Sequence, residues 1–472
     1  MRKWVRAVLS GTVAIALTVS MLAYLTELVE RKNSRQKYEQ FKTQQADFDV
    51  LFMGTSHVIN GVYPMELWED YGMVSYNFGG HANTLAVTEW TLENALRYTT
   101  PRLVVIDGLR LSITTRIYDN VENAHVSFDA FPLNATKVKA ALDLTEDKMQ
   151  RAELIWDFSI YHDRWSQIVM NDFVPGATPE KGAESRIAVA ENAVFTPIDR
   201  SRVLTDDTVG VAYLRKAIEL CQQRGIDVLL TYLPFPASEG EQMEANRIYE
   251  IAAEYGVDYI NFLDMDLVDF TVDSYDPVSH LNPSGARKVT DYLGKYIREH
   301  YDVPDRRQDP AYAGWYEDYE AYTKFKLDNL GAQTDLKNYL MLLQDKHLSA
   351  CVYLAENELW HSGVYERLLA NMGVDSGQLR PEGPTLAVVD NMTGSVVYLG
   401  AGEKAETGFG ETRFVEKNGA YGVRINGGGV MVLQSNASLG AVVVDNASGA
   451  AATSSQFAVT VQPAASSVTK IP

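Results

Sequence analysis

The sequence predicts an α/β domain with a parallel sheet, followed by a second, β-rich sandwich-like domain, both behind an N-terminal apolar segment. At 472 residues the chain exceeds what one ordinary core holds, so two domains are expected. Up to about residue 301, short apolar runs alternate with helical patterns. Beyond about residue 331, short strand-like runs follow one another with Gly, Asn and Asp between them.

Residues 1–27 are expected to form a transmembrane anchor. Arg2, Lys3 and Arg6 precede residues 7–25, which carry no charge. At about 1.5 Å per residue, this run spans nearly the ~30 Å of a bilayer core. The basic residues hold the N-terminus in the cytoplasm and place the rest of the chain outside, as a single-pass protein. A cleaved signal peptide is the alternative, although its apolar core is normally only about 7–15 residues long.

The α/β domain is expected over residues 49–301, after a charged helical stalk at 28–48. Five apolar runs are predicted to be strands: 50–53, 74–78, 103–107, 228–233 and 259–262. Helical patterns follow most of them: 84–97, 209–224, 242–255 and 283–300. Continuous apolar strands between helices favour a parallel sheet covered on both faces. Residues about 108–207 interrupt this rhythm and are expected to form a cap insertion.

The remaining chain is expected to divide into a linker, a second domain and a tail. Residues 302–330 contain two prolines, Pro304 and Pro310, and dense aromatics, and are predicted to be the linker. Residues 331–462 would form the β-rich domain, and residues 463–472 a loose tail.

Composition excludes some classes of function. The formal net charge is −20, with no basic cluster beyond the N-terminal segments, so a nucleic acid would be repelled. Cys221 and Cys351 are the only cysteines, and no His/Cys cluster has metal-ligand spacing. The sequence therefore predicts no metal site and no cofactor.

Three residues suggest nucleophilic catalysis. Sites in open α/β sheets form at the carboxyl ends of the strands, and Ser56 directly follows the first predicted strand. A nucleophilic serine needs a base and a group that orients the base, and Asp276 and His280 share a loop before the last helix. The alternatives are structural: Ser56 as a helix N-cap, His280 as a backbone-bonded loop residue, and Asp276 as a turn former.

These residues resemble a known family. The motif "GTSH" at 54–57, with "DPVSHLNPSGARKVTDYL" at 276–293, resembles the SGNH/GDSL hydrolase superfamily over about residues 45–300. The chain looks most like the membrane-anchored bacterial branch that includes exopolysaccharide O-acetylation and teichoic-acid D-alanylation proteins. The resemblance implies a flavodoxin-like three-layer fold, with Ser56 as nucleophile, His280 as general base and Asp276 as the acid that orients it.

The resemblance also implies an oxyanion hole, with two departures from the family pattern. Its donors would be the backbone N–H of Ser56, the N–H of Gly80 and the side-chain amide of Asn83. The usual Asp-x-x-His spacing is one residue longer here, so either the loop bulges or another group orients the histidine; Asp273 is nearby. The usual Gly-x-Asn-Asp block is replaced by "TYLPFP" at 231–236.

The implied function is an extracytoplasmic serine O-acyltransferase or esterase acting on a polysaccharide or teichoic-acid-like polymer. A multi-pass membrane O-acyltransferase would be the partner that supplies the acyl group. A polysaccharide deacetylase or esterase with the same triad is one alternative. A non-catalytic scaffold with a degenerate triad is another, from a different class.

For several other residues, a structural role is the main expectation. His57 is expected to support the turn, His81 to be a solvent-facing loop residue and Asp107 to cap or pair locally. His162 and Arg164 either touch an anionic or sugar substrate or pack the cap. The second domain faintly resembles the interleukin-like EMT inducer domain, which implies a β-sandwich and a packing, docking or glycan-binding role.

Overall fold

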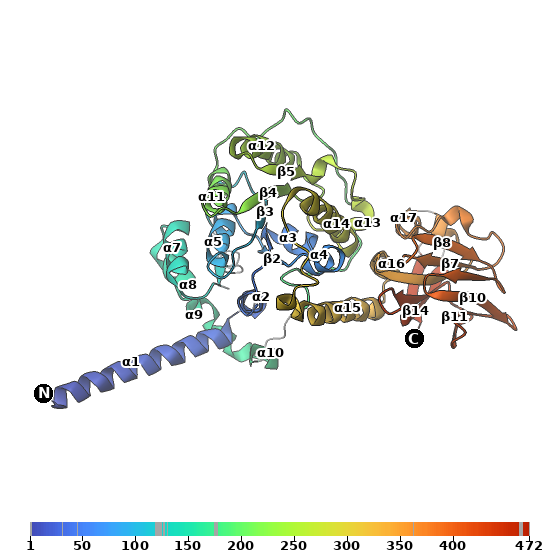
Figure 1. Ribbon diagram of the computed structural model, residues 1–472, viewed down its shortest axis with the longest axis horizontal. Coiled ribbons are helices and arrows are strands. Elements are labelled where there is room, and N and C mark those ends of the chain that lie inside the picture. The colour runs from blue at the N-terminus through green and yellow to red at the C-terminus, as the bar shows by residue number, and fades with distance from the viewer. Residues whose placement is uncertain are drawn as a thin grey trace. The chain divides into compact units, whose positions relative to one another are not determined.

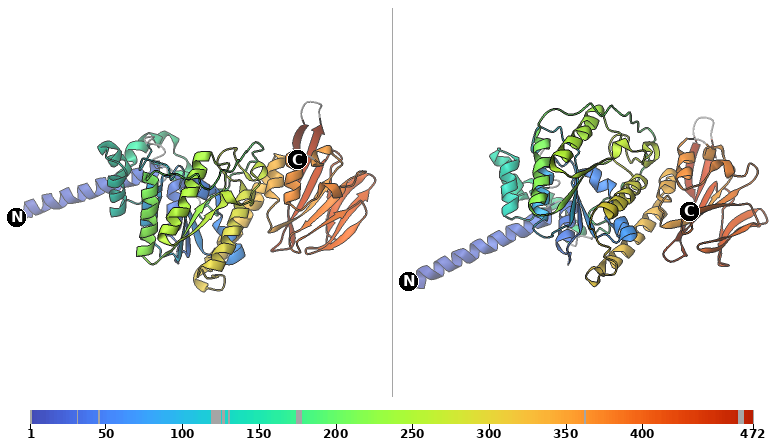
Figure 2. Two further views of the ribbon diagram at one scale, coloured as in Figure 1. Left: turned by 90° about the horizontal axis from the view of Figure 1, so that it is seen from above. Right: turned by 45° about the horizontal axis from the view of Figure 1, so that its top comes forward.

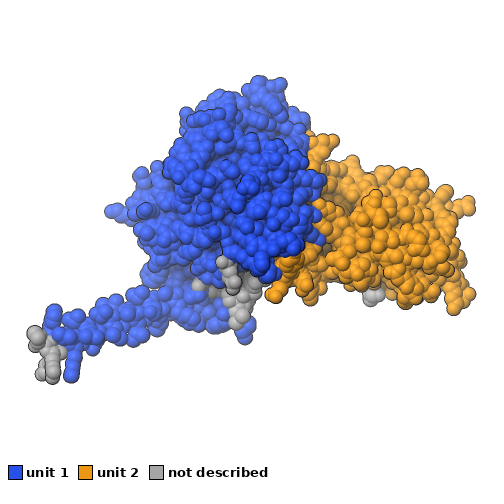
Figure 3. Space-filling model, in the orientation of Figure 1, with its two compact units in different colours: residues 1–184, 197–265, 290–314 blue, residues 185–196, 266–289, 315–472 orange. Residues whose placement is uncertain are grey.

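The protein is described by a computed structural model that covers residues 2–30, 32–44, 46–118, 125, 128–129, 131–173, 178–361, 363–461 and 466–471. The chain forms two compact units, coloured separately in Figure 3. Unit 1 contains residues 1–184, 197–265 and 290–314, and unit 2 contains residues 185–196, 266–289 and 315–472. The chain therefore crosses between the units several times.

The chain begins with the long helix α1 (Arg2–Val29), the blue helix at the N-terminus in Figure 1. The segment Trp4–Val29 contains a stretch with a mean hydropathy of 1.9 and is long and apolar enough to cross a membrane. A signal anchor and a signal peptide both have this character. Helix α2 (Lys32–Lys42) follows within the segment expected to be a stalk.

Helix α2 packs onto the sheet of unit 1. The Phe41 ring lies 4.5 Å from that of Phe78 and 5.3 Å from that of Tyr76, centroid to centroid. Tyr38 packs beside them, and both α2 aromatics are almost fully buried. Residues in this stretch therefore contribute to the core of unit 1 rather than only linking it to α1.

The sheet of unit 1 is parallel, as predicted, with strand order β2-β1-β3-β4-β5. This is the flavodoxin-like order. The strands lie close to the predicted runs: β1 (Val50–Gly54), β2 (Ser75–Gly79), β3 (Leu103–Asp107), β4 (Asp227–Tyr232) and β5 (Asp258–Asn261). Every residue of the first three strands is buried, which explains their continuous apolar pattern.

Helices cover both faces of this sheet and make three layers (Figures 1 and 2). One layer contains α5 (Leu85–Ala95), α11 (Val209–Gln223) and α12 (Glu239–Tyr255). The other contains α3 (Ser56–Gly61), α4 (Pro64–Tyr71) and the second half of α14 (Pro283–His300). A short 3₁₀ turn, η2 (Phe262–Asp264), follows β5.

The insertion after β3 is mainly helical over residues 135–173 and irregular over residues 178–207. It contains α7 (Ala135–Leu144), α8 (Lys148–Ile155), α9 (Phe158–Tyr161), the 3₁₀ helix η1 (His162–Gln167) and α10 (Met170–Phe173). Helix α7 packs against α5, whereas α9, η1 and α10 pack against α1. Residues 119–124 and 174–177 of the insertion lie outside the described residues.

Unit 2 contains two antiparallel sheets, which confirms the predicted sandwich-like domain. The larger sheet has the order β15-β14-β13-β6-β7-β8 and the smaller one β12-β11-β10-β9. The strands are β6 (Leu348–Leu354), β7 (Thr385–Asp390), β8 (Ser395–Leu399), β9 (Lys404–Thr407), β10 (Gly410–Lys417), β11 (Ala420–Ile425), β12 (Val430–Val432), β13 (Leu439–Asp445), β14 (Ala450–Val461) and β15 (Ser466–Ile471).

Two central strands of the larger sheet of unit 2, β6 and β7, are buried on both faces. Along β6, Cys351 and Tyr353 join a core with Phe414 of the smaller sheet, whereas Val352 and Leu354 join a core with helical residues. The helices of unit 2 are α13 (Phe270–Asp273), α15 (Gly314–Ala332), α16 (Leu336–Leu342) and α17 (Gly363–Asn371), with short 3₁₀ turns η4 (Glu358–His361) and η5 (Ser376–Gln378). The 3₁₀ turn η3 (Pro310–Tyr312) lies in unit 1.

Two segments differ from their sequence-based expectation. The segment expected as a linker, 302–330, holds most of α15, whose residues Trp315 and Leu330 are buried. Part of the expected loose tail forms β15, which pairs with β14 along six residues; residues 463–465 and 472 lie outside the described residues. Neither segment has a clear apolar periodicity, so the sequence alone did not predict its structure, which depends on tertiary contacts.

Candidate active site

The predicted nucleophile, Ser56, lies where the strand order of the unit 1 sheet reverses. Strand β1 pairs with β2 on one side and with β3 on the other, so the chain leaves β1 and β3 toward opposite faces. In open α/β sheets, ligands bind outside the carboxyl ends of the strands at such a switch point. Ser56 begins the helix that follows β1, and it is half-buried there.

Thr55, not Ser56, caps this helix. The Thr55 hydroxyl accepts a hydrogen bond from the N–H of His57 at 3.2 Å, and Thr55 has extended backbone angles. Ser56 is the first residue inside α3. The N-cap role that could have explained Ser56 structurally therefore belongs to its neighbour.

Two glycines allow the turn around Ser56 to pack closely. Gly54 has a φ of +154°, and a Cβ atom there would lie 2.7 Å from Val58 Cγ2. A Cβ on Gly79, at the end of β2, would lie 2.7 Å from both the Thr55 carbonyl oxygen and the Ile59 nitrogen. Because these are backbone atoms, only glycine lets β2 approach the turn this closely.

The predicted oxyanion residues gather beside this turn, but their donors are engaged. The N–H of Gly80 donates to the Gly54 carbonyl at 3.0 Å. The Asn83 side-chain amide donates to the same carbonyl at 3.5 Å, and Asn83 is buried. The structure thus brings Gly80 and Asn83 to the turn before Ser56 and points both donors at Gly54.

Asn77 fixes this region and was missed by the sequence analysis. Its side-chain amide donates to the carbonyls of Val58 at 2.6 Å and Val62 at 2.8 Å, and its oxygen accepts from the N–H of Gly79 at 3.0 Å. Asn77 is fully buried and ties the end of β2 to α3. An asparagine inside the apolar run "YNFG" was the signal, because a buried amide needs partners.

Lys37 on α2 reaches the same strand end. Its ammonium donates to the carbonyls of Gly79 and Gly182, each at 2.7 Å. Burial lowers the pKa of Lys37 to about 7, although Glu184 opposes the shift. Glu184 also lies 3.3 Å from His81, so His81 is a half-buried, paired residue rather than a solvent-facing one.

Asp107 is the last residue of β3, on the other side of the switch point from β2. One of its carboxylate oxygens accepts from the N–H of Leu233 at 2.8 Å and the other from that of Leu109 at 3.3 Å. Asp107 therefore pairs locally, as expected. Burial raises the pKa of Asp107 to about 7, because its hydrogen bonds only partly offset the cost of a buried charge.

His57 packs edge-on against Phe235, with ring centroids 4.4 Å apart.

The predicted acid and base lie in the loop of residues 275–280 in unit 2. A β-bridge between Ser274 and Leu281 closes the loop, and the N–H of Tyr275 donates to the His280 carbonyl at 2.8 Å. Within it, Asp276 Oδ2 lies 2.6 Å from His280 Nδ1. The loop therefore pairs the predicted acid with the predicted base.

Asp276 is held as a carboxylate. Its other oxygen accepts from the N–H groups of Val278 at 3.0 Å and Ser279 at 2.7 Å. Partial burial favours the neutral acid, but the hydrogen bonds from His280 and these amides outweigh it and hold the pKa of Asp276 below its usual value. A carboxylate that can only accept selects the tautomer with the proton on Nδ1, which places the lone pair of neutral His280 on Nε2.

Asp273, the other acid near His280 in sequence, has different partners. It accepts from Lys288 Nζ at 2.6 Å and from the Ser284 hydroxyl at 2.7 Å, and it is fully buried. Beside it, the Asn282 oxygen accepts from the N–H groups of Ser284 and Gly285 and so caps α14, with Pro283 as the first helical residue. These contacts account for the motif "NPSG".

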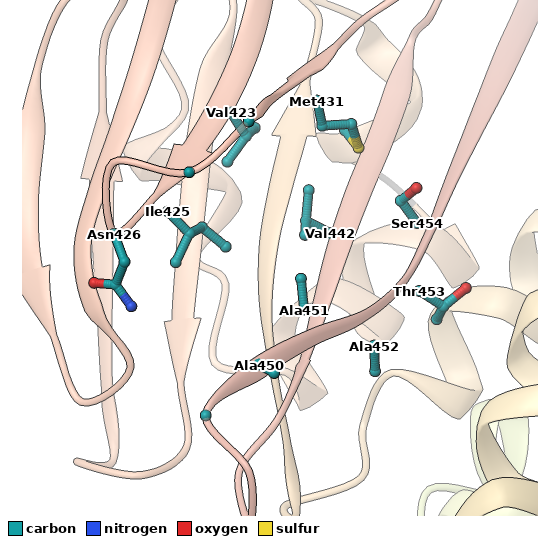
Figure 4. A pocket seen from close by; sticks show the side chains of 13 residues that line it. Val423, Ile425, Asn426, Met431, Val442, Ala450, Ala451, Ala452, Thr453 and Ser454 are labelled. Carbon is teal, nitrogen blue, oxygen red and sulfur yellow. The ribbon is translucent and has the colours of Figure 1, made fainter.

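A separate cavity lies in the sandwich of unit 2 (Figure 4). It has a volume of about 450 Å³ and is lined mostly by apolar and small side chains, among them Ile425, Met431, Val442 and Ala451. None of its lining residues has a titratable side chain, so the cavity offers a binding surface without acid–base groups.

Comparisons with known proteins add little to this geometry. No protein-family model and no curated protein matches the chain. Among solved structures, it is similar to the crystal structure of a Bacteroides fragilis protein that is provisionally named an acylhydrolase. The two are 12% identical, with a TM-score of 0.30, over 57% of this chain and 98% of the other. The functional argument therefore depends on the residues themselves.

Proposed function

We propose that this protein is a serine-dependent acyl-transfer enzyme in which Ser56 is the nucleophile and the Asp276–His280 pair is its base. The observation that carries the proposal is the 2.6 Å contact between Asp276 Oδ2 and His280 Nδ1. An aspartate that fixes the tautomer of a histidine is the arrangement that a nucleophilic serine requires. The position of Ser56 at the sheet's switch point supports the choice of nucleophile.

In the proposed reaction, His280 Nε2 takes the proton of Ser56 Oγ as this oxygen attacks the carbonyl carbon of an acyl ester. The tetrahedral intermediate collapses when His280 returns the proton to the leaving alcohol, which leaves an acyl group on Ser56. A sugar hydroxyl or water then attacks the acyl-serine, with the same histidine as base and then as acid. The Asp276 carboxylate stabilises the imidazolium that forms in each step.

The proposed oxyanion donor is first the backbone N–H of Ser56. The N–H of Gly80 is engaged with the Gly54 carbonyl at 3.0 Å, so its participation requires that hydrogen bond to open. The Asn83 contact with the same carbonyl is longer, at 3.5 Å, which makes its amide the easier donor to redirect. Donors of this kind are each worth roughly 2.7–4 kcal/mol in acyl transfer.

We further propose an extracytoplasmic polysaccharide or teichoic-acid-like polymer as substrate, with α1 as an uncleaved anchor whose N-terminus lies in the cytoplasm. The basic residues before the apolar run support this orientation. A multi-pass membrane O-acyltransferase would supply the acyl group. This assignment rests on the sequence resemblance and on the apolar helix.

Covalent labelling tests the nucleophile. A fluorophosphonate should label the wild-type protein, and labelling should be lost in Ser56→Ala and strongly slowed in His280→Gln. Ser201→Ala, which changes an exposed serine of unit 1, is the matched control and should label like the wild type. No labelling of the folded wild type would favour a non-catalytic scaffold.

Product analysis separates transfer from hydrolysis. The protein is incubated with a soluble acetyl ester donor and an oligosaccharide acceptor, and acetylated sugar and free acetate are both measured. Acetylated sugar that depends on Ser56 supports the transferase. Acetate alone supports the deacetylase or esterase alternative.

A further inference from the structure

Large apolar side chains are exposed on the segment that packs against the end of α1. Within residues 156–173, five large apolar side chains are exposed, including Trp165 at 71% and Met170 at 77%. The full set, which we call the collar, is Trp156, Trp165, Val169, Met170 and Phe173. Soluble surfaces rarely gather so many large apolar groups in so short a stretch, because exposing them to water is costly.

The elements that carry the collar are fixed to α1 by specific hydrogen bonds. The indole N–H of Trp156 donates to the Thr26 hydroxyl at 3.3 Å. The Arg164 guanidinium donates to the Val29 carbonyl at 2.6 Å and also to that of Glu30. These carbonyls at the end of a helix have no partner within the helix, so Arg164 acts as a C-terminal cap.

A second residue holds Arg164 in place. Asp172 is buried, lies 3.1 Å from Arg164 and accepts from the N–H of Val169 at 2.8 Å. Together with the packing of α9, η1 and α10 on α1, this fixes the segment that carries the collar at the level of the last turns of α1, where Figure 1 shows α9 and α10. Arg164 therefore packs the insertion rather than reaching for a substrate.

The length of α1 places that level at the membrane surface. Residues 4–25 rise by about 1.5 Å each and so cover the ~30 Å hydrocarbon core. Thr26, Val29 and Glu30 then lie in the headgroup region on the outer side. Tryptophan and other amphipathic aromatic side chains are favoured at this depth.

We propose that the collar inserts into the outer interface of the lipid bilayer and seats unit 1 on the membrane, beside the point where α1 leaves it. The charges within residues 156–173 are Asp157, Asp163, Asp172 and Arg164, which include no basic cluster. The occupant is therefore a lipid surface bound by burial of apolar area, not by attraction to anionic headgroups.

Spin labels on the full-length protein in phosphatidylcholine nanodiscs test this proposal. The native Cys221 and Cys351 are fully buried, so a nitroxide reagent reaches only an introduced cysteine in the folded protein. The test variants are Trp165→Cys and Met170→Cys. The matched control is Ala253→Cys, an exposed alanine on α12. Each label's accessibility to dissolved oxygen and to a water-soluble nickel chelate is measured.

The labels at 165 and 170 should be several-fold more accessible to oxygen, relative to the nickel chelate, than the label at 253. Equal, water-like accessibility at all three positions would overturn the proposal, as would a lipid-like signal that requires anionic lipid or disappears at high salt. The result depends on α1 lying in the bilayer but not on Ser56 chemistry. Failure here would leave fluorophosphonate labelling unaffected, so the two proposals are distinguishable.

Discussion

Asp276 Oδ2 lies 2.6 Å from His280 Nδ1 although four positions separate the two residues in the chain. The loop between them makes this contact by turning tightly around Asp276, whose other oxygen accepts from the N–H groups of Val278 and Ser279. Asparagine and aspartate side chains commonly stabilise such turns. The turn therefore brings the Asp276 carboxylate to His280 despite the three residues between them.

The first prediction concerns this pair. Asp276→Asn should slow fluorophosphonate labelling of Ser56 by about 10²–10⁴-fold, because an amide no longer selects the tautomer with its proton on Nδ1 or stabilises the imidazolium. Labelling rates under single-turnover conditions give the ratio. An unchanged rate would show that a different group orients His280.

Asp273→Asn is the matched control for that variant. Asp273 is buried against Lys288 and Ser284, three residues before Asp276 in the chain. Removing its charge leaves a cation without its partner, which should lower the thermal midpoint of unfolding. The labelling rate of the protein that remains folded should stay near that of the wild type.

The second prediction concerns close packing beside Ser56. Gly79→Ala places a Cβ atom 2.7 Å from backbone atoms of Thr55 and Ile59, so the turn must shift. A displacement of about 1 Å in the position of a reacting group can slow a reaction on the order of 10²-fold. The labelling rate should fall accordingly, together with a lower thermal midpoint.

Gly240→Ala provides the comparison for Gly79→Ala. Gly240 lies in the first turn of α12, and a Cβ atom there meets nothing within 4 Å. Replacing it should leave labelling unchanged and stabilise the protein by up to about 1 kcal/mol, because alanine has less freedom in the unfolded chain. Equal effects of the two substitutions would contradict the packing argument.

The third prediction concerns the pH dependence of stability. Burial raises the pKa of Asp107 from 3.8 to about 7, so the folded protein binds more protons than the unfolded chain between pH 4 and 7. This group's contribution to the free energy of unfolding is therefore fully present below pH 4 and falls as the pH rises to 7, by a few kcal/mol in order of magnitude.

Asp107→Asn isolates that contribution. The variant should have a thermal midpoint that falls less than the wild type's between pH 4 and 7, since the amide does not titrate. Its midpoint at pH 4 should be lower, because an amide accepts through one oxygen and Asp107 uses both. Parallel pH profiles of the two proteins would refute the raised pKa.

The fourth prediction concerns a buried ion cluster in unit 2. Asp345 is fully buried, 3.2 Å from Arg287 and 3.0 Å from Lys326. Burial opposes its charge, but these cations outweigh it and hold the pKa of Asp345 well below its usual value. Its contribution to stability is present above about pH 4 and is lost as the pH falls further.

Asp345→Asn should destabilise unit 2 by about 3–5 kcal/mol at neutral pH, because the buried Lys326 and the largely buried Arg287 lose their counter-charge. Asp328→Asn removes an ion pair with Lys324 whose side chains are 65% and 75% exposed, and it should cost about 0–1 kcal/mol. Thermal unfolding of both variants measures the difference. Similar costs would mean that burial does not decide the strength of these pairs.

The sequence was informative about the α/β unit because its strands are buried on both faces. Continuous apolar runs at β1, β3 and β4, with Gly54 at the end of β1 and Gly108 after β3, are local signals that need no tertiary information. The same reasoning missed Asn77 as a structural residue, since its role depends on Val58 and Val62, which become its neighbours only after folding.

The sequence by itself determined the class of the fold and the apolar N-terminal helix, because residue type and periodicity carry that information. It also singled out Ser56, after the first strand, and the distant loop with Asp276 and His280 as candidate site residues. Only the tertiary structure decided that Asp276, and not Asp273, contacts His280. It also decided that Thr55 rather than Ser56 caps α3. In the same way, it decided that the N–H of Gly80 donates to the carbonyl of Gly54. These outcomes depend on which polar groups meet within a few ångströms, and hydrogen-bond partners are chosen by the folded backbone rather than by spacing along the chain.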